Sequence, residues 1–412
     1  MNEAAVSSLQ GSEGARAGLS LAVVNTLEGL AALELEWEEL FGSSPSPTPF
    51  MSWEWSYHWC RNYRPGDSMH VVVLRDQEGG LCGIVPLMRV PASWGQLGLR
   101  EVRFLSDYRS SCLGCTGFLL RPGWEPACLQ ALCAYLAEAP WWDRLRLSPI
   151  RADAANLWEF CRQAAAAQFR TEMRLHSWQR HAPLPKTFDA YLEQCSRNRR
   201  RRLRSSMRNL EKRHDFHLRT SHTENEARSV VAWLVARKRE RMHAKRQWTW
   251  FDDPRYGSFL QDFTAAALHK GRGRLLSLEL DGQLAGCALL FVTANAATFY
   301  FDAFAPAYES EHIIDAITGF VLQACIDEGL DLLDFMWGEM PHHYAKEKAS
   351  ALTLHVYRPR PRSLLFEGLA HAVVPAWHGA RAVMPHRVVG ALSRFLKRES
   401  AGGAAAGGDG EL

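Results

Sequence analysis

Residues 274 to 347 carry the most regular pattern of apolar and polar positions in the chain. Apolar runs of strand length alternate with turn residues, and one longer stretch has apolar residues three and four positions apart. The pattern predicts five elements in this order: strands at 274–280, 283–292 and 296–303, a helix at 312–328 and a buried strand at 330–337. Asp281-Gly282 is a strong hairpin signal, and Gly329 ends the helix as a capping glycine would. Together these elements predict a compact α/β unit.

An earlier part of the chain repeats this order of elements. The predicted elements are a strand, turn and strand at 70–89, a strand at 114–120, a helix at 124–137 and a strand at 141–150. The later copy ends in the polar loop 338–348, whereas the first ends in SPIRADAAN, without histidine, tyrosine or lysine. We therefore interpret the chain as two copies of one α/β unit, and we assign the first a structural or substrate-shaping role.

Changes in composition along the chain predict its domain organisation. Five segments are expected: a disordered N-terminus at 1–18, an N-terminal unit at 19–185, a C-terminal unit at 186–360, basic amphipathic helices at 361–400 and a flexible tail at 401–412. Residues 351–360 are predicted as one more strand that closes the sheet. The basic helices are typical of a segment that docks on the protein body, or of one that lies on a membrane surface.

Composition restricts the class of protein. Apolar residues make up 47% of the chain and charged residues 23%, which is typical of a soluble globular protein. No apolar run reaches the roughly 20 residues of a membrane-spanning helix, and the N-terminus lacks a signal-peptide pattern. Ten scattered cysteines indicate reduced thiols in a cytoplasmic compartment. Cys112 and Cys115 form a C-x₂-C without a second pair, so we expect packing residues and no metal site.

The segment 196–213 (SRNRRRRLRSSMRNLEKR) is the most basic part of the chain. Leu203, Met207 and Leu210 recur at helical spacing, which predicts a helix with one buried stripe and one cationic face. Three interpretations remain open. The cationic face is solvated, or it binds phosphates of a donor, an anionic substrate or an anionic lipid, or it contacts nucleic acid.

Large aromatic residues cluster in the segment 50–63. Trp53, Trp55 and Trp59 lie close together there in a predicted helix. The favoured interpretation is that they pack in a core, and the alternative is that they line an acyl or substrate pocket.

Three stretches carry a resemblance to a known family: the arginine-rich SRNRRRRLRSSMRNLEK, the hairpin DGQLAGCALLF and the closing DFMWGEMPHHYAKE. With the order of elements they resemble the GNAT superfamily of N-acyltransferases, over roughly residues 190–350. The likeness is to its two-copy bacterial branch, which includes acetyltransferases found near cellulose and exopolysaccharide clusters and is similar to Fem-type peptidyltransferases. The resemblance implies an α/β fold of two tandem GNAT-like units with mixed sheets, the second carrying the donor site.

The resemblance also implies that acyl-CoA is the co-substrate. Its diphosphate would lie against the loop and the backbone N–H groups that open the helix at 312–328. The residues expected to bind it are Asp302, Ala303, Phe304, Ala305, Ser310, Glu311 and His312. Arg199 and Arg202 of the basic segment are expected to bind substrate.

Catalytic residues are expected just beyond the last strand of the second unit, in the loop that follows it. Acyl transfer to an amine needs a base and stabilisation of the tetrahedral oxyanion. Glu339, His342 and His343 are candidate bases, Tyr344 a candidate acid for the leaving thiolate, and Lys346 a candidate partner for negative charge. Asp302 and Asp334 are interpreted as structural carboxylates at strand ends.

These observations predict an acyl-CoA-dependent N-acyltransferase acting on an amine of a sugar, lipid or cell-envelope precursor. One alternative is a Fem-like transferase that uses aminoacyl-tRNA, and another is a catalytically silent binding protein. In the favoured reading no nucleic acid partner is expected. The protein is expected in the cytoplasm, with peripheral contact to the inner membrane through the basic C-terminal helices.

Overall fold

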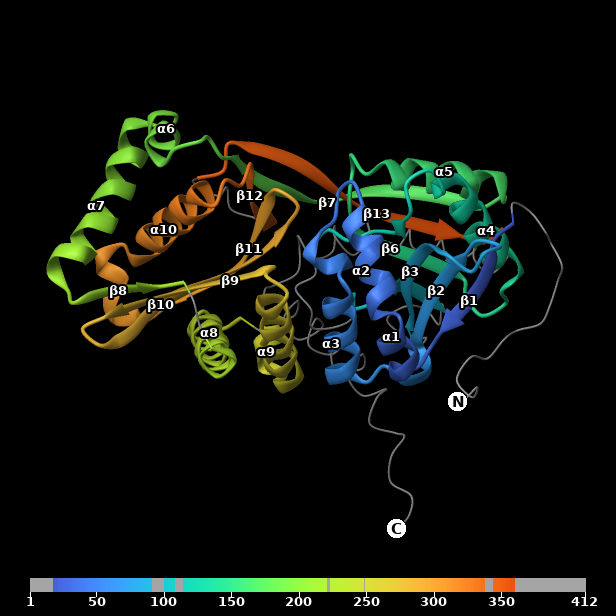
Figure 1. The fold of residues 1–412 in the computed structure, drawn as a ribbon, viewed down its shortest axis with the longest axis horizontal. Helices are drawn as coiled ribbons and strands as arrows, with labels where there is room; N and C mark the ends of the chain where they lie inside the picture. Colours follow the sequence, from blue (N-terminus) through green and yellow to red (C-terminus); the bar gives the residue numbers. More distant parts are fainter. Residues whose placement is uncertain are drawn as a thin grey trace, which may run out of the picture.

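The structure is a computed structural model that describes residues 18–90, 100–107, 114–220, 223–247, 249–337 and 344–359. Its centre is a 13-stranded mixed sheet with helices on both faces (Figure 1). The strands follow the order β1-β2-β3-β4-β6-β13-β7-β12-β11-β10-β9-β8, and β5 pairs separately with β3. The predicted C-terminal helices at 361–400, the tail and residues 1–17 lie outside the described residues.

The elements have the following bounds. The strands are β1 (Ser20–Val24), β2 (Met69–Arg75), β3 (Leu81–Val90), β4 (Glu101–Phe104), β5 (Leu119–Leu120), β6 (Arg144–Arg151), β7 (Arg170–Pro183), β8 (Phe216–Arg219), β9 (Gly273–Leu280), β10 (Gln283–Thr293), β11 (Ala296–Phe304), β12 (Leu332–Trp337) and β13 (Glu347–Tyr357). The α-helices are α1 (Leu27–Ala32), α2 (Glu34–Ser43), α3 (Trp53–Tyr63), α4 (Glu125–Glu138), α5 (Ala155–Ala166), α6 (Phe188–Glu193), α7 (Arg197–Arg213), α8 (Glu224–Ala244), α9 (Pro254–His269) and α10 (Ile313–Asp327).

Two units of similar topology make up the sheet, which confirms the interpretation of a repeated α/β unit. In the first unit β4 and β6 pair in parallel through the crossover helix α4, and in the second β11 and β12 pair in parallel through α10. Antiparallel strands precede the crossover in both units. The same elements therefore recur in the same order, as the sequence predicted.

The last strand of each unit crosses into the sheet of the other, and we call this feature the strand exchange. β7, at the end of the first unit, pairs antiparallel with β12 of the second, while β13 pairs antiparallel with β6 of the first. β7 and β13 also pair with each other and join the two sheets into one. Residues 351–360 were expected to close the sheet, and β13 closes that of the first unit.

The third strand of the first unit differs from the sequence prediction. A strand was expected at 114–120, but only Leu119–Leu120 pairs there, with β3. The third strand is β4, where Glu101 and Arg103 put charged side chains on one face. Glu101 pairs with Arg103 and with Arg144 on β6, so the strand lacks the apolar signature of its counterpart β11.

Helices cover the two faces of the sheet in separate groups. α1, α2, α3, α8 and α9 share one apolar core on one face, around Trp37, Trp55 and Phe259. On the other face α6, α7 and α10 form a core over the second unit, and α4 and α5 form one over the first (Figure 1). Trp53, Trp55 and Trp59 are buried in α3, which confirms the core interpretation of the aromatic segment.

The turn and the helix end that the sequence predicted are both present in the structure. Asp281 and Gly282 both have positive φ, at 53° and 75°, which is the two-residue hairpin turn that the pair predicted. Gly329 has a φ of 79° directly after α10 and ends that helix. In the described ranges, no helix has both the length and the hydropathy needed to cross a membrane.

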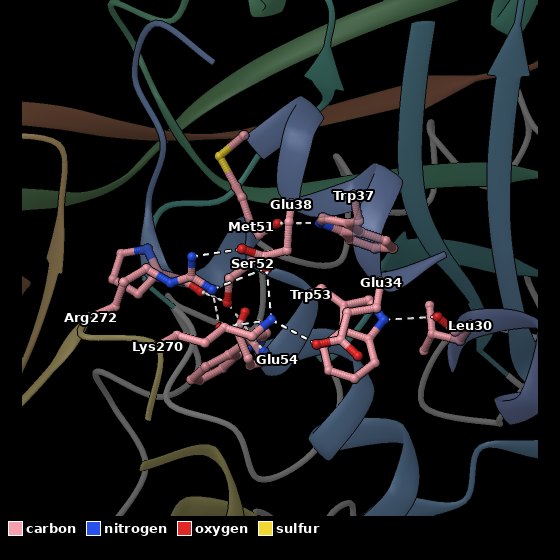
Figure 2. A network of polar contacts seen from close by, with 12 residues as sticks. Leu30, Glu34, Trp37, Glu38, Met51, Ser52, Trp53, Glu54, Lys270 and Arg272 are labelled. Carbon is pink, nitrogen blue, oxygen red and sulfur yellow. Dashed lines mark hydrogen bonds and ion pairs between the residues drawn. The ribbon is translucent and has the colours of Figure 1, made fainter. Parts of the chain in front are cut away.

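A network of ion pairs joins the two units, as Figure 2 shows. Glu54 on α3 is 1% exposed, and its carboxylate contacts Arg272 and Lys270, which follow α9. Arg272 also binds Glu38 on α2 through Nη1 at 2.7 Å, and Lys270 binds Glu34 at 2.9 Å. Burial raises the pKa of Glu54, whereas the charges of Arg272 and Lys270 oppose this rise and favour the carboxylate.

Candidate functional site

The parallel strands β11 and β12 pair over three residues and then separate. Ala296 to Thr298 pair with Leu332 to Asp334, and beyond these residues β11 continues to Phe304 next to β10 alone. Met336 has a φ of 58°, and the pairing of β12 with β7 shifts register between Asp334 and Trp337. Such bulges and positive φ values re-aim side chains and cluster at functional sites. We call the region where the two strands no longer pair the slot.

A recess of about 50 Å³ lies at the point where the slot begins, on the face of the sheet that carries α3. The recess is lined from both units, because the strand exchange brings β7 beside β12. Its polar lining residues are Thr48, Arg151, Gln179, His181, Thr293, Thr298 and Asp334. Phe50, Cys115 and Met336 supply apolar surface.

Asp334 and His181 form the ionisable centre of the recess. They are paired across β12 and β7, and His181 Nε2 lies 3.6 Å from Asp334 Oδ1. The backbone N–H of Met336 donates to the same carboxylate at 2.7 Å. Burial raises the pKa of Asp334 above its ordinary value, while His181 opposes this rise. Asp334 is therefore a stronger base than a solvated aspartate, and it lies in a site that a small group can enter.

The other face of the slot is built around Asp315, in the first turn of α10. Its carboxylate is 7% exposed and accepts hydrogen bonds from the Tyr344 hydroxyl at 2.5 Å and from Arg202 Nε at 2.6 Å. Arg199 lies with its guanidinium carbon 6.0 Å from the Tyr344 ring centre. The structure thus brings together Arg199, Arg202 and Tyr344, all expected from sequence, at the start of the helix expected to bind a diphosphate. Asp315, the acceptor at their centre, was not expected.

Tyr344 and Lys346 have defined partners on this face. Burial and the Asp315 carboxylate raise the pKa of Tyr344, so its hydroxyl keeps its proton. The Tyr191 hydroxyl donates to the Tyr344 carbonyl at 2.9 Å. Lys346 donates to Gln194, and its ammonium lies 4.6 Å from the Tyr191 ring centre. Burial lowers the pKa of Lys346. Both side chains face α6 and α10, on the side of the sheet opposite the recess.

The residues expected to hold the donor lie along the edge of β11 and the turn that follows it. Asp302, Ala303 and Phe304 belong to β11, so the loop begins only at Ala305. Asp302 binds Lys238 of α8 at 3.0 Å; burial opposes ionisation of this carboxyl, but Lys238 lowers its pKa below the ordinary value. Arg241 lies 5.1 Å from the Phe304 ring centre.

The remaining donor candidates lie in a 3₁₀ turn (Pro306–Glu311) and at the residue before α10. Glu311 accepts from His214 Nε2 at 3.1 Å, and Ser310 is exposed. His312 takes a left-handed conformation and is the N-cap of α10. Basic side chains from α7 and α8 therefore flank both sides of the mouth of the slot.

Three expected catalytic residues, Glu339, His342 and His343, lie outside the described residues. Sequence reasoning missed Gln179, His181 and Asp315, and took Asp334 as structural. The carboxylate after a buried run was a visible signal for Asp334, whereas His181 and Gln179 had none, because their approach depends on the strand exchange. Within the described ranges, no three histidine, cysteine or acidic side chains gather in a way that could hold a metal ion.

Comparison with known proteins finds a family match in the second unit. Residues 197–344, which include α7, the slot and Tyr344, match the model of a family described as Acetyltransferase (GNAT) domain. This segment of the chain is similar to a GNAT acetyltransferase domain. The GNAT domain extends from the start of α7 to the residue that binds Asp315, so it contains Asp334, whereas Gln179 and His181 precede it.

Two solved structures share the fold over most of their length. One is FemX, with a TM-score of 0.57 and 12% identity, covering 82% of this chain and 98% of FemX. The other is a conserved protein of unknown function from Bacteroides thetaiotaomicron, with a TM-score of 0.53 and 7% identity, covering 82% of this chain and all of that one. At these identities the likeness shows a common fold alone. No curated protein matches the sequence.

Proposed function

We propose that the protein transfers an acyl group from an activated donor to an amine, with the acyl carbonyl in the slot and the amine in the recess. The single observation that carries this proposal is the Asp334–His181 pair at the point where β11 and β12 separate. A GNAT domain supplies the reaction class. The attacking amine needs a base, and the recess provides Asp334, a carboxylate of raised pKa in a cavity large enough for a small group.

In this mechanism Asp334 accepts the proton of the attacking amine, and His181 stabilises the carboxylate before the transfer. The amine attacks the acyl carbonyl directly. Cys115 lines the same recess, but burial raises the pKa of its thiol, so it stays protonated and is not a covalent nucleophile. Tyr344 and Arg202 hold Asp315 and thereby fix the start of α10 beside the donor.

The proposed donor is an acyl-CoA. The separated edge of β11 offers a place for its pantetheine arm, and Arg241 and Arg199 place positive charge beside the slot, which suits phosphates. The acceptor would be an amine on a sugar, a lipid or a cell-envelope precursor. A cytoplasmic protein with peripheral membrane contact stays a prediction, because the basic helices at 361–400 lie outside the described residues.

A second donor, an aminoacyl-tRNA, is favoured by two observations. The Asp315 carboxylate occupies the first turn of α10, where a diphosphate would meet negative charge. α7 carries exposed basic side chains that have no acidic partner among the described residues: Arg197, Arg201, Arg208 and Lys212. They span about 22 Å at 1.5 Å per residue, a length that suits a polyphosphate backbone.

Binding measurements separate the two donors. If the donor is acyl-CoA, isothermal titration with acetyl-CoA and a long-chain acyl-CoA shows binding of at least one, with a shallow dependence on salt. If it is aminoacyl-tRNA, affinity falls steeply with salt, and an Arg201→Glu/Arg208→Glu variant loses binding at least tenfold. An Arg255→Glu variant on α9 is the matched control and should bind normally, because Arg255 pairs with Asp253 away from the slot. Absence of binding by both donors would favour a silent binding protein.

A further inference from the structure

Gln179 is a buried amide with an unused hydrogen-bond donor. It lies on β7, which the strand exchange places beside β12, and it lines the recess together with His181. The residue is 2% exposed, and its Nε2 has no hydrogen-bond partner among the described residues. A buried donor without an acceptor lowers the stability of the fold, and in a native protein it therefore calls for a functional explanation.

The surroundings of Gln179 fit an incoming oxygen. Phe50, Cys115 and Met336 line the same recess and lower its polarity, and a fixed donor in such surroundings acts strongly on a developing negative charge. Asp334, the proposed base, lines the recess as well. The proposed base, Asp334, and the hydrogen-bond donor, Gln179, thus come from adjacent strands, one from each unit.

We propose that the recess, which receives the amine, also takes the oxygen of the acyl carbonyl from the adjoining slot, and that Gln179 Nε2 donates to this oxygen as it becomes negative. This inference rests on the proposed acyl transfer. The amine nitrogen forms a bond to the carbonyl carbon, and the π electrons move to the oxygen, which accepts the Gln179 hydrogen bond. The amine proton passes to Asp334. When the intermediate collapses, the C–S bond of the thioester (or the C–O bond of the tRNA ester) breaks, and the leaving group takes up the proton that Asp334 accepted, which restores the carboxylate.

This assignment explains why the first unit is present although the GNAT domain lies in the second. The first unit contributes Gln179 and His181 through β7 and encloses the recess with Phe50, Cys115 and Arg151. Its role, expected from sequence as structural or substrate-shaping, extends under this proposal to contact with the reacting atoms.

The test uses opposite effects on stability and turnover. Gln179→Met keeps the volume but removes the unused hydrogen-bond donor, so the melting temperature should rise by about 1–3 °C for a chain of this length. The same change should lower kcat by about 100- to 1,000-fold, the usual loss for one oxyanion donor, with KM within about threefold. Ser177→Ala is the matched control, because the Ser177 hydroxyl on the same strand is also buried without a partner but does not line the recess. It should not lower kcat.

The outcomes decide between the possibilities. Unchanged kcat in a folded Gln179→Met protein overturns the proposal, and so does a lowered melting temperature, which would show a structural amide. If Gln179→Met does not fold, Gln179→Asn, which withdraws the amide by one methylene, should lower kcat; unchanged kcat there overturns the proposal too. If the wild-type protein transfers no acyl group from either donor, the proposed function fails. In that case the melting temperatures still test whether the Gln179 side-chain amide is a buried hydrogen-bond donor without a partner.

Discussion

Replacing Asp334 with asparagine is expected to lower kcat by about 100- to 10,000-fold, the usual contribution of a positioned general base. The substitution preserves shape and the hydrogen bond from the Met336 N–H, but it removes the proton acceptor of the recess. Binding of the acyl donor should stay within about twofold, because the proposed donor site lies along β11 and α10. The measurement is steady-state acyl transfer beside isothermal titration of the donor.

Asp331→Asn is the control for this prediction. Asp331 lies just before β12, is exposed and bonds to Asn295, so it has the same chemistry outside the recess. Its kcat should match that of the wild type. Turnover by Asp334→Asn at the wild-type rate would place the base elsewhere, first of all at Glu339, His342 or His343.

The dependence of kcat on pH follows from the same carboxylate. As the proposed base, Asp334 would act only when ionised, so wild-type activity should fall as the pH drops through its pKa. Because burial raises that pKa, the fall should begin at a higher pH than a solvated aspartate would give. The acidic limb should be missing from the residual activity of Asp334→Asn.

The Arg272→Met variant is expected to lower the free energy of unfolding by about 3–5 kcal/mol, the usual cost of leaving a buried charge without its partner. Glu54 is 1% exposed at the junction of the two units, and Arg272 also holds Glu38 (Figure 2). The methionine fills part of the space but leaves both carboxylates with Lys270 alone. Denaturant unfolding followed by tryptophan fluorescence would measure the loss, since Trp37 and Trp53 lie beside the network.

A double variant tests the cause of this loss. Adding Glu54→Gln to Arg272→Met removes the uncompensated charge and should recover part of the stability, so the two changes should not be additive. Arg255→Met, which breaks an exposed pair with Asp253, should cost no more than about 1 kcal/mol. Additive losses would show that Arg272 stabilises the junction by packing alone.

The contacts within each segment were predictable from sequence. Three features depend only on neighbours a few residues away. They are the Asp281-Gly282 turn, the end of α10 at Gly329 and the helical spacing of Leu203, Met207 and Leu210. Their outcomes follow from backbone preferences and from burial of one helix face. The third strand of the first unit escaped prediction because Glu101 is buried by ion pairs instead of apolar contacts.

The sequence by itself determined the repeated α/β unit, the likeness to GNAT transferases and the cationic face of α7, because each is a pattern of residue types along one segment. Only the tertiary structure decided that β7 lies against β12, and this pairing alone brings Gln179 and His181 to Asp334. About 150 residues separate the two strands, and no local preference records which distant edge a strand will pair with. In the same way, Asp315 became the partner of Tyr344 and Arg202 because α7, α10 and the end of the loop before β13 pack together.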